Sequence, residues 1–330
     1  MASLKEIKTR IASVKNTLKI TSAMKLVASA KLHKAQMAID GMMPYNERLT
    51  QIVSQLVQIE KDSVDGLTKP CGADSPSIRH LINLSIEPKR VALVTVSSST
   101  SLCGGFNNNI IRFTQQVIHE YQERLGQGSV ILLPIGRKVA QALQVDKAQG
   151  DKLTNSYNKA LLSTIPDYID LGEHPTYAQA SVLAKHLTEM FLHGEVDCVE
   201  LLYTHYKNMA VQEIRRERFL PIEMEERRVD KVQDLKEGDT SLFPFLPSSF
   251  ILEPSLPELL DRLLPQALAS RMYAMLLDSS AAEHAARTFA MQTATDNGDA
   301  LLQELNILYN KSRQQAITNE LLDIMGGQMR

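Results

Sequence analysis

The sequence predicts an α/β fold: a long antiparallel coiled coil of the N- and C-terminal helices, with an inserted, mostly parallel α/β sheet domain. Three observations lead to this prediction. Apolar residues repeat at coiled-coil spacing near the N-terminus, a long stretch near the C-terminus contains no proline, and β-branched runs alternate with helical segments between them. Tryptophan is absent and aromatic residues are only 5% of the chain, which suits long helices better than an aromatic core.

Residues 1–60 are predicted to form the N-terminal coiled-coil helix. The seam of a two-helix coiled coil needs apolar residues at alternating spacings of three and four, and five residues fit it: Leu4, Ile7, Ile11, Val14 and Leu18. Beyond residue 20 the apolar residues point in several directions, which indicates a helix enclosed on more than one side. Gly41 and Pro44 are expected to kink this helix.

Residues 88–222 are predicted to form the α/β domain. Strands are expected at 91–96, 129–135 and 196–206, with a more exposed strand at 211–222, and helical stretches separate the first three. This alternation predicts a mostly parallel sheet with both faces covered. Residues 61–87 and 223–253, rich in Pro, Ser, Gly and charge, are expected to be loops or links.

Residues 254–330 are predicted to form the C-terminal coiled-coil helix. Between residues 266 and 325 there is no proline and one glycine, Gly298, so this helix is expected to be roughly 90 Å long. Its expected seam is Leu301, Leu305, Leu308 and Ser312, and a close helix approach is expected at Ala281, Ala282, Ala285 and Ala286. An insert of this size, with a radius of gyration near 14 Å, cannot cover such helices, so they should pair and project from a domain at their base.

The stretch VTVSSSTSLCGGFNNNI, residues 94–110, has the outline of a phosphate-binding loop. It lacks the lysine of a P-loop and the third glycine of a dinucleotide-binding turn. We therefore interpret Cys103, Gly104 and Gly105 as a structural turn, with an asparagine of 107–109 capping the next helix. No base is coupled to Cys103 by any local signature, so no catalytic residue and no cofactor site are predicted.

Other candidate sites have simpler interpretations. His186, Glu189 and His193 share a helical face but lack the His-Glu-x-x-His spacing of a zinc protease, so no metal site is predicted. The mixed charges of 213–219 and 223–230 are expected to form a solvated edge. Three widely spaced cysteines, Cys71, Cys103 and Cys198, give no disulfide framework and indicate a reducing compartment.

The first 40 residues contain eight Lys and Arg against Glu6 and Asp40. This basic character suits nucleic-acid binding, a mitochondrial transit peptide or the solvated flank of a coiled coil. The composition favours the solvated flank, facing an acidic partner surface, and no nucleic acid is expected as a partner. A stretch of roughly 18 apolar residues, which a membrane span requires, is absent from the sequence.

Both ends of the chain resemble the gamma subunit of the rotary proton-translocating ATP synthase. IKTRIASVKNTLKITSAMKLVASAKLHKAQ (7–36) is similar to the family's N-terminal helix, and AAEHAARTFAMQTATDNGDALLQELNILYNKSRQQAITNELLDIMGG (281–327) to its C-terminal helix. LCGGFNNNI (102–110) matches the loop after the first strand of the family's central domain. The family usually has Asp, Arg and Gly where this chain has Ser99, Thr100 and Ser101, so the Asp–Arg pair is absent here.

This resemblance implies a central rotor shaft and no catalysis by the chain itself. The coiled coil would turn inside a ring of three alpha and three beta subunits, which hold the catalytic residues. The α/β domain would sit with the epsilon subunit on the membrane ring of c subunits, and proton flow would turn ring and shaft together. The expected location is the cytoplasmic face of a bacterial plasma membrane, because the chain starts directly at the family's motif.

The resemblance also implies which residues form the partner interface. Met24 matches a methionine on the shaft within the catalytic head. Polar positions that would contact the ring are Arg313, Gln314, Thr318 and Glu320, and the apolar tip that would turn in an apolar sleeve is Leu321, Leu322, Ile324 and Met325.

Two alternatives follow from the residues alone. An α/β enzyme with helical arms would bind a nucleotide as an isolated chain. A coiled-coil scaffold with no rotary role would form a stable homodimer instead of contributing one copy to a hetero-oligomer.

Overall fold

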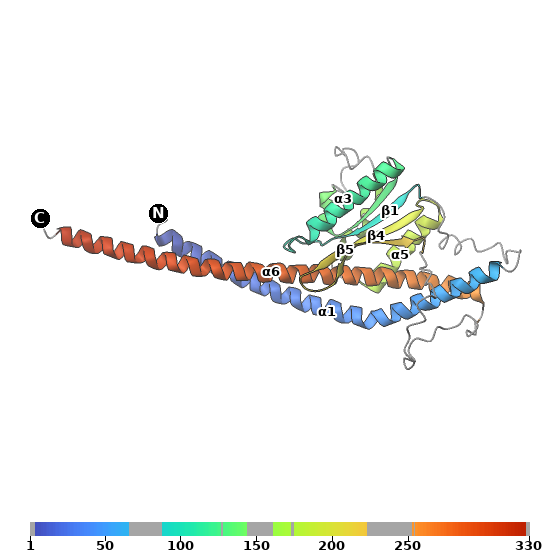
Figure 1. Cartoon of the computed structure of the whole chain (residues 1–330), viewed down its shortest axis with the longest axis horizontal. Helices are drawn as coiled ribbons and strands as arrows, with labels where there is room; N and C mark the ends of the chain where they lie inside the picture. Colours follow the sequence, from blue (N-terminus) through green and yellow to red (C-terminus); the bar gives the residue numbers. More distant parts are fainter. Residues whose placement is uncertain are drawn as a thin grey trace, which may run out of the picture.

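A computed structural model describes residues 4–65, 88–126, 128–143, 161–172, 175–222, 253 and 255–327. Two long helices, α1 (Leu4–Asp65) and α6 (Leu256–Gly327), begin and end the described chain. Figure 1 shows them side by side and running in opposite directions, so that both termini lie toward the same end of the molecule. The predicted antiparallel coiled coil is therefore confirmed.

The seam of the coiled coil follows the prediction on α1 and differs from it on α6. Ile7 is buried, and the other four predicted α1 positions are half-buried. On α6, Leu305 is buried and Ser312 half-buried, but Leu301 and Leu308 are exposed. The half-buried positions that complete this seam are Leu302 and Tyr309. Two stripes at coiled-coil spacing pass through Leu305 and Ser312, so the spacing alone could not choose between them.

The register of the two helices is fixed by a close approach at Gly298. A Cβ atom at this glycine would lie 2.6 Å from Cδ2 of Leu18, so a larger side chain would displace Leu18 or separate the helices. One turn away, Oγ1 of Thr295 donates a hydrogen bond of 3.1 Å to Oγ1 of Thr21. These contacts place Leu18 and Thr21 of α1 opposite Gly298 and Thr295 of α6, in the part of the coiled coil that projects from the sheet domain.

Helix α1 continues through Gly41 and Pro44, and Figure 1 shows it bending part-way along its length. A proline inside a helix removes a backbone hydrogen bond and bends the axis. Beyond Pro44, α1 buries apolar residues in the main core: Leu49, Val53, Leu56 and Val57. The predicted links 61–87 and 223–253 fall mostly outside the described residues.

The inserted domain is built on a five-stranded sheet in the order β3-β2-β1-β4-β5. Its strands are β1 (Val91–Val96), β2 (Val130–Ile135), β3 (Leu161–Thr164), β4 (Cys198–Tyr206) and β5 (Gln212–Leu220). The pairs β1–β2, β1–β4 and β2–β3 are parallel, and β4–β5 is antiparallel. The prediction of a mostly parallel sheet is confirmed. The edge strand β3 was missed because its four residues are too few to show a period.

Helices cover both faces of this sheet. On one face lie α3 (Phe106–Leu125) and α4 (Arg137–Ala142), and on the other α5 (Tyr177–Leu192) and parts of α1 and α6; a short 3-10 helix, Pro166–Gly172, follows β3. Successive residues of β1 alternate between the faces: Val91 and Leu93 pack toward α3, whereas Ala92 and Val94 pack toward α5 and α6. Both faces are apolar because both are buried.

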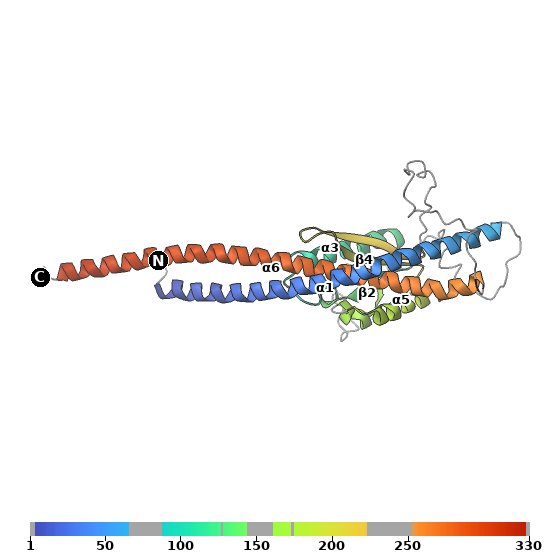
Figure 2. The same ribbon diagram turned by 90° about the horizontal axis from the view of Figure 1, so that it is seen from below.

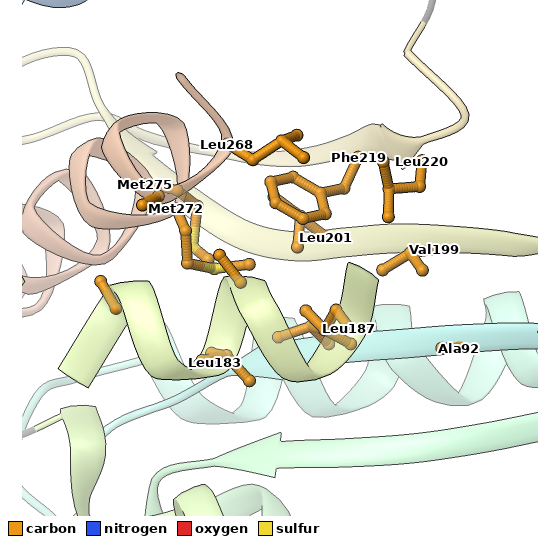
Figure 3. Close-up of a cluster of buried hydrophobic side chains, with 14 of the residues drawn as sticks. Ala92, Leu183, Leu187, Val199, Leu201, Phe219, Leu220, Leu268, Met272 and Met275 are labelled. Carbon is orange, nitrogen blue, oxygen red and sulfur yellow. The ribbon is translucent and has the colours of Figure 1, made fainter. Parts of the chain in front are cut away.

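The first half of α6 is part of the domain core, which corrects the expected shape. Leu268, Met272 and Met275 of α6 pack against Leu183 and other residues of α5 and the sheet (Figure 3). The domain therefore lies alongside the coiled coil and not only at its base. The expectation that the domain lies only at the base was drawn from its size, and it was wrong here. The helix α5 covers only part of one face of the sheet, so the remaining apolar side chains of that face are buried against α6.

The four alanines of α6 contact two different elements. Ala281 and Ala285 pack against Leu32 and Ala35 of α1, as the close helix approach predicts. Ala282 and Ala286 instead pack against Cys103 and Phe106 at the start of α3. Small residues on two adjacent sides of α6 thus admit α1 on one side and the sheet domain on the other.

The mixed charges of β5 are more buried than predicted. Arg216 donates hydrogen bonds of 2.8 Å to Glu200, Glu120 and the Tyr121 hydroxyl, while that hydroxyl donates to Glu200 at 2.7 Å. Burial, and next the hydrogen bond to Glu200, raise the pKa of Tyr121 above its ordinary value. The expected solvated edge is wrong for Arg216, because buried Glu200 on the neighbouring strand requires a cation. Residues 223–230 lie outside the described residues.

Cys198 should be unreactive in the folded protein. Its side chain is buried at the start of β4, and burial raises the pKa of its thiol to about 11, with a smaller contribution from the charge of Glu200. Because the thiolate is the reactive form, alkylation of Cys198 at pH 8 should be slow until the chain is unfolded. The same shift should lower the free energy of unfolding as pH rises from 9 toward 11.

Mass spectrometry of the peptide that contains Cys198, after timed alkylation of native and urea-unfolded chain, measures this difference. Equal labelling rates in the two states would contradict the burial of this thiol.

Candidate functional site

The turn after β1 is a packed structural element. Cys103 is 2% exposed, and Leu102 and Gly104 adopt φ angles of 68° and 59°. The left-handed conformation at 104 suits glycine, which has no Cβ to oppose it. Gly105 is the N-cap residue of α3 and brings no side-chain cap.

Asn107 ties the turn to the end of β1 instead of capping α3, which corrects that expectation. Its Oδ1 accepts a hydrogen bond of 3.1 Å from the Ser98 amide, and its Nδ2 donates one of 3.1 Å to Sγ of Cys103. The buried thiol thus accepts a hydrogen bond inside a closed loop. Among the described residues, the side chains that hydrogen-bond to the Cys103 thiol are Ser98 and Asn107, and neither is a base that would activate a nucleophile.

Helix α6 occupies the place where an open α/β sheet normally binds its ligand. Such ligands lie beyond the carboxyl ends of neighbouring strands at the point where the strand order reverses. Here those strands are β1 and β4. Ala282 and Ala286 pack onto the turn after β1, and Oδ1 of Asp278 accepts a hydrogen bond of 3.0 Å from the Tyr206 amide at the end of β4. The protein's own helix therefore packs at the crevice between β1 and β4.

We therefore expect the isolated chain to have no specific affinity for magnesium-ATP and no ATPase activity. The turn lacks a phosphate-binding lysine, and α6 occupies the crevice. Isothermal titration of the full chain measures this directly. A one-to-one isotherm with micromolar affinity would contradict it and would favour an enzyme with helical arms.

The histidines of α5 are not brought together as a metal site. Nδ1 of His186 lies 2.7 Å from the Tyr168 hydroxyl, Glu189 pairs with Lys185, and His193 is the C-cap residue of α5. Among the residues that the structure describes, no group of three or more His, Cys, Asp and Glu could hold a metal ion.

The C-terminal end of α6 extends beyond the described end of α1. Given the pairing of Gly298 with Leu18, the first residue of α1 lies level with about residue 312 of α6. Residues 313–327 continue for roughly 22 Å beyond the described part of α1. Figure 2 shows this part of α6 extending past the N-terminus. A single helix of this length needs a partner to bury its apolar residues.

The side chains that are expected to contact a partner at this end are exposed in the isolated chain. Leu321 is 56% and Ile324 62% exposed, and Leu322 and Met325 are exposed as well. Arg313, Gln314, Thr318 and Glu320 are exposed, and the Thr318 hydroxyl donates a hydrogen bond to the Gln314 carbonyl. Along α6, these polar residues come before the exposed apolar residues of the tip. Such a group of exposed apolar residues is suited to burial against a surrounding protein.

A second exposed apolar stripe lies on α1. Met24 is 40% exposed, and Ile20 and Val27, at positions i−4 and i+3 on the same face, are each 58% exposed. α6 covers the seam side of α1, while this stripe faces away from it. The sequence predicted that this helix is enclosed on more than one side. Within this chain α6 covers one side of it, and the side that carries Met24 is exposed.

Comparison with known proteins decides the family. The ATP synthase family model ("ATP-synt") matches residues 3–329. The ATP synthase gamma chain of Phocaeicola vulgatus is 47% identical over the whole of both chains, and that of Flavobacterium johnsoniae is 36% identical over 99% of this chain and 98% of its own. The chain belongs to the ATP synthase gamma family.

The family explains the architecture. The central stalk of the Tetrahymena thermophila mitochondrial ATP synthase has the same fold, with a TM-score of 0.52, 22% identity, and coverage of 83% of this chain and 99% of that chain. The resemblance found in the sequence is confirmed, and a scaffold outside this family is not favoured. The described helices include none that is long and apolar enough to cross a membrane.

Two residues that matter for the arrangement were missed in the sequence. Asp278 of α6 contacts the end of β4, and Arg287 of α6 contacts the loop after β1. A usable signal was present, because each is a charged residue within a stretch of small and apolar residues, where an unpaired charge would be costly.

Proposed function

We propose that this chain is the central rotor shaft of an ATP synthase, a non-catalytic subunit that couples rotation of the membrane c-ring to the catalytic cycle of the beta subunits. Proton flow turns the c-ring together with the sheet domain and the epsilon subunit. The coiled coil turns inside the ring of three alpha and three beta subunits. Because the shaft is asymmetric, each beta subunit meets a different face of it at each angle and passes through its nucleotide states in turn.

The observation that carries this proposal is the projecting end of the coiled coil, in a chain of the gamma family. Two helices extend from the domain, and α6 continues beyond α1 with exposed apolar residues. A shaft inside a ring meets partner surfaces on several sides, so it carries apolar residues on faces that a stalk in water would leave polar. The packing of α6 at the crevice between β1 and β4 is consistent with a subunit that carries out no nucleotide chemistry itself.

The interface with the catalytic ring is formed by residues of both helices. Met24 contacts the ring from α1, together with Ile20 and Val27. Arg313, Gln314, Thr318 and Glu320 make polar contacts from α6, and Leu321 and Ile324 turn in an apolar sleeve. Polar contacts of this kind are directional, so they hold the shaft more strongly at some angles than at others.

The proposed location follows from these partners. The c-ring is a membrane ring, so the shaft is held at the membrane by its partners. In a bacterium of the kind that supplies the relatives, this is the cytoplasmic face of the plasma membrane.

Affinity purification of the tagged chain from its host tests the proposal. We expect alpha and beta subunits in a three-to-three ratio with one copy of this chain, together with epsilon and c subunits. A stable homodimer without these partners would contradict it and would favour the scaffold alternative.

A further inference from the structure

We propose that Asp278 and Arg287 form a two-sided clamp that fixes the angle of the sheet domain around α6. This inference rests on the proposed shaft function and concerns how rotation passes from the domain to the coiled coil. The two residues are positioning residues: they touch no nucleotide and act through the elements that they hold.

One side of the clamp is at the carboxyl end of β4. The Asp278 carboxylate accepts a hydrogen bond from the Tyr206 amide at 3.0 Å, and its other oxygen lies 2.6 Å from Nδ1 of His205. The side chains of Asp278 and His205 are 18% and 26% exposed. Both carboxylate oxygens are thus engaged by two consecutive residues of one strand.

The other side of the clamp is at the loop after β1. Nη2 of Arg287 donates a hydrogen bond of 2.7 Å to Oγ1 of Thr100, and its Nη1 donates one of 2.7 Å to Oε1 of Glu283, one helical turn earlier on α6. The side chains of Arg287 and Glu283 are 15% and 12% exposed. Glu283 therefore holds the guanidinium in the orientation that reaches the loop.

The two contacts lie on either side of the face of α6 that packs on the loop after β1. Arg287 follows Asp278 by nine positions, which is about two and a half helical turns, so the two side chains leave the helix in opposite directions. A rotation of α6 about its own axis in either sense therefore stretches one of the two contacts. Between them, Ala282 and Ala286 pack on Cys103 and Phe106 and keep the loop close to the helix.

The apolar core alone does not supply this angular lock. Leu268, Met272 and Met275 attach the domain to the first half of α6, but apolar burial is non-directional and tolerates small rotations. Hydrogen bonds weaken steeply as their angles change. Removing the clamp should therefore leave the domain attached while making its angle on the shaft less well defined.

The test compares Asp278→Ala combined with Arg287→Ala against a matched control, Asp261→Ala combined with Arg262→Ala. The control removes the same two charges from exposed positions of the same helix. In the full chain, hydrogen exchange should become faster at the ends of β1 and β4 in the clamp variant alone, and by more than in the middle of the same two strands. Unchanged exchange at these ends would overturn the inference.

In the assembled complex, reconstituted in vesicles, ATP hydrolysis by the clamp variant should stay near wild type. The ratio of protons pumped to ATP hydrolysed should fall several-fold. If the double variant does not fold, Thr100→Val breaks only the loop contact, with Ser101→Val as its exposed control, and the same fall in the ratio is expected. An unchanged ratio in complexes of normal composition would overturn the clamp and leave the shaft function intact. Failure of the wild-type chain to assemble with alpha and beta subunits would overturn both.

Discussion

Replacing Arg313 and Gln314 together by alanine is expected to lower ATP turnover by the assembled complex several-fold, while folding of the isolated chain stays nearly unchanged. Both side chains are exposed on the part of α6 that has no partner helix, so the chain alone loses little with them. Inside a subunit ring they meet partner groups only at some angles of the shaft. A hydrogen bond to a charged group contributes about 1.5–3 kcal/mol, so its loss changes the relative energies of those angles.

The measurement is steady-state hydrolysis by complexes of verified subunit composition, with thermal melting of the variant chain alone. Arg112→Ala combined with Gln116→Ala is the matched control, because it removes the same residue types from exposed positions of α3 in the sheet domain. Wild-type turnover by a fully assembled Arg313/Gln314 variant would mean that these side chains do not contribute to ATP turnover. The proposal that α6 contacts the subunit ring at these two residues would then be wrong.

Replacing Ala281 and Ala285 by leucine is expected to destabilise the chain strongly. Both are fully buried where α6 packs against Leu32 and Ala35 of α1, and two larger side chains cannot enter this contact unless the helices separate. Overpacking of a dense core costs roughly 1–3 kcal/mol per site. The free energy of unfolding of the double variant should fall accordingly.

Urea unfolding of the full chain, followed by helical circular dichroism, measures this loss. Ala300→Leu is the control, because Ala300 is exposed on the same helix and should tolerate leucine. An equal free energy of unfolding for the double variant and this control would show that α1 and α6 do not approach one another closely at these alanines. Ala282 and Ala286 allow a second comparison, since leucine there should disturb the turn at Cys103 and Phe106 instead of the coiled coil.

Much of the fold could be predicted because long periodic segments dominate this chain. The seam of α1, the parallel strands β1, β2 and β4, and the helices between them follow from spacing and from β-branched runs. The α6 seam could not be chosen, because leucines at 301, 302, 305 and 308 fit two stripes, and only the contact of Gly298 with Leu18 selects one. The packing of α6 on the sheet depends on contacts between residues far apart in sequence, which no local pattern contains.

The polar contacts were harder to foresee than the apolar ones. Asn107 lies close to the start of α3, and asparagine often caps a helix, yet its side chain bonds to the Ser98 amide and the Cys103 thiol instead. In the sequence, Arg216 belongs to a run of charged residues that is expected to be solvated. In the fold it donates a hydrogen bond to Glu200, which is buried on the next strand. In both cases the fold determines which residues the polar side chain contacts.

Rotation of the sheet domain is the most direct measure of the central claim. The catalytic head, assembled with this chain and fixed to a surface through its beta subunits, would carry a bead on a cysteine introduced at Lys185, whose side chain is 78% exposed on α5. Cys103 and Cys198 are buried, and Cys71 would be replaced by serine. Addition of magnesium-ATP should make the bead turn in one direction in steps of one third of a turn, one for each beta subunit. A bead that stays at one angle while the same complexes hydrolyse ATP would contradict the role of this chain as the rotor.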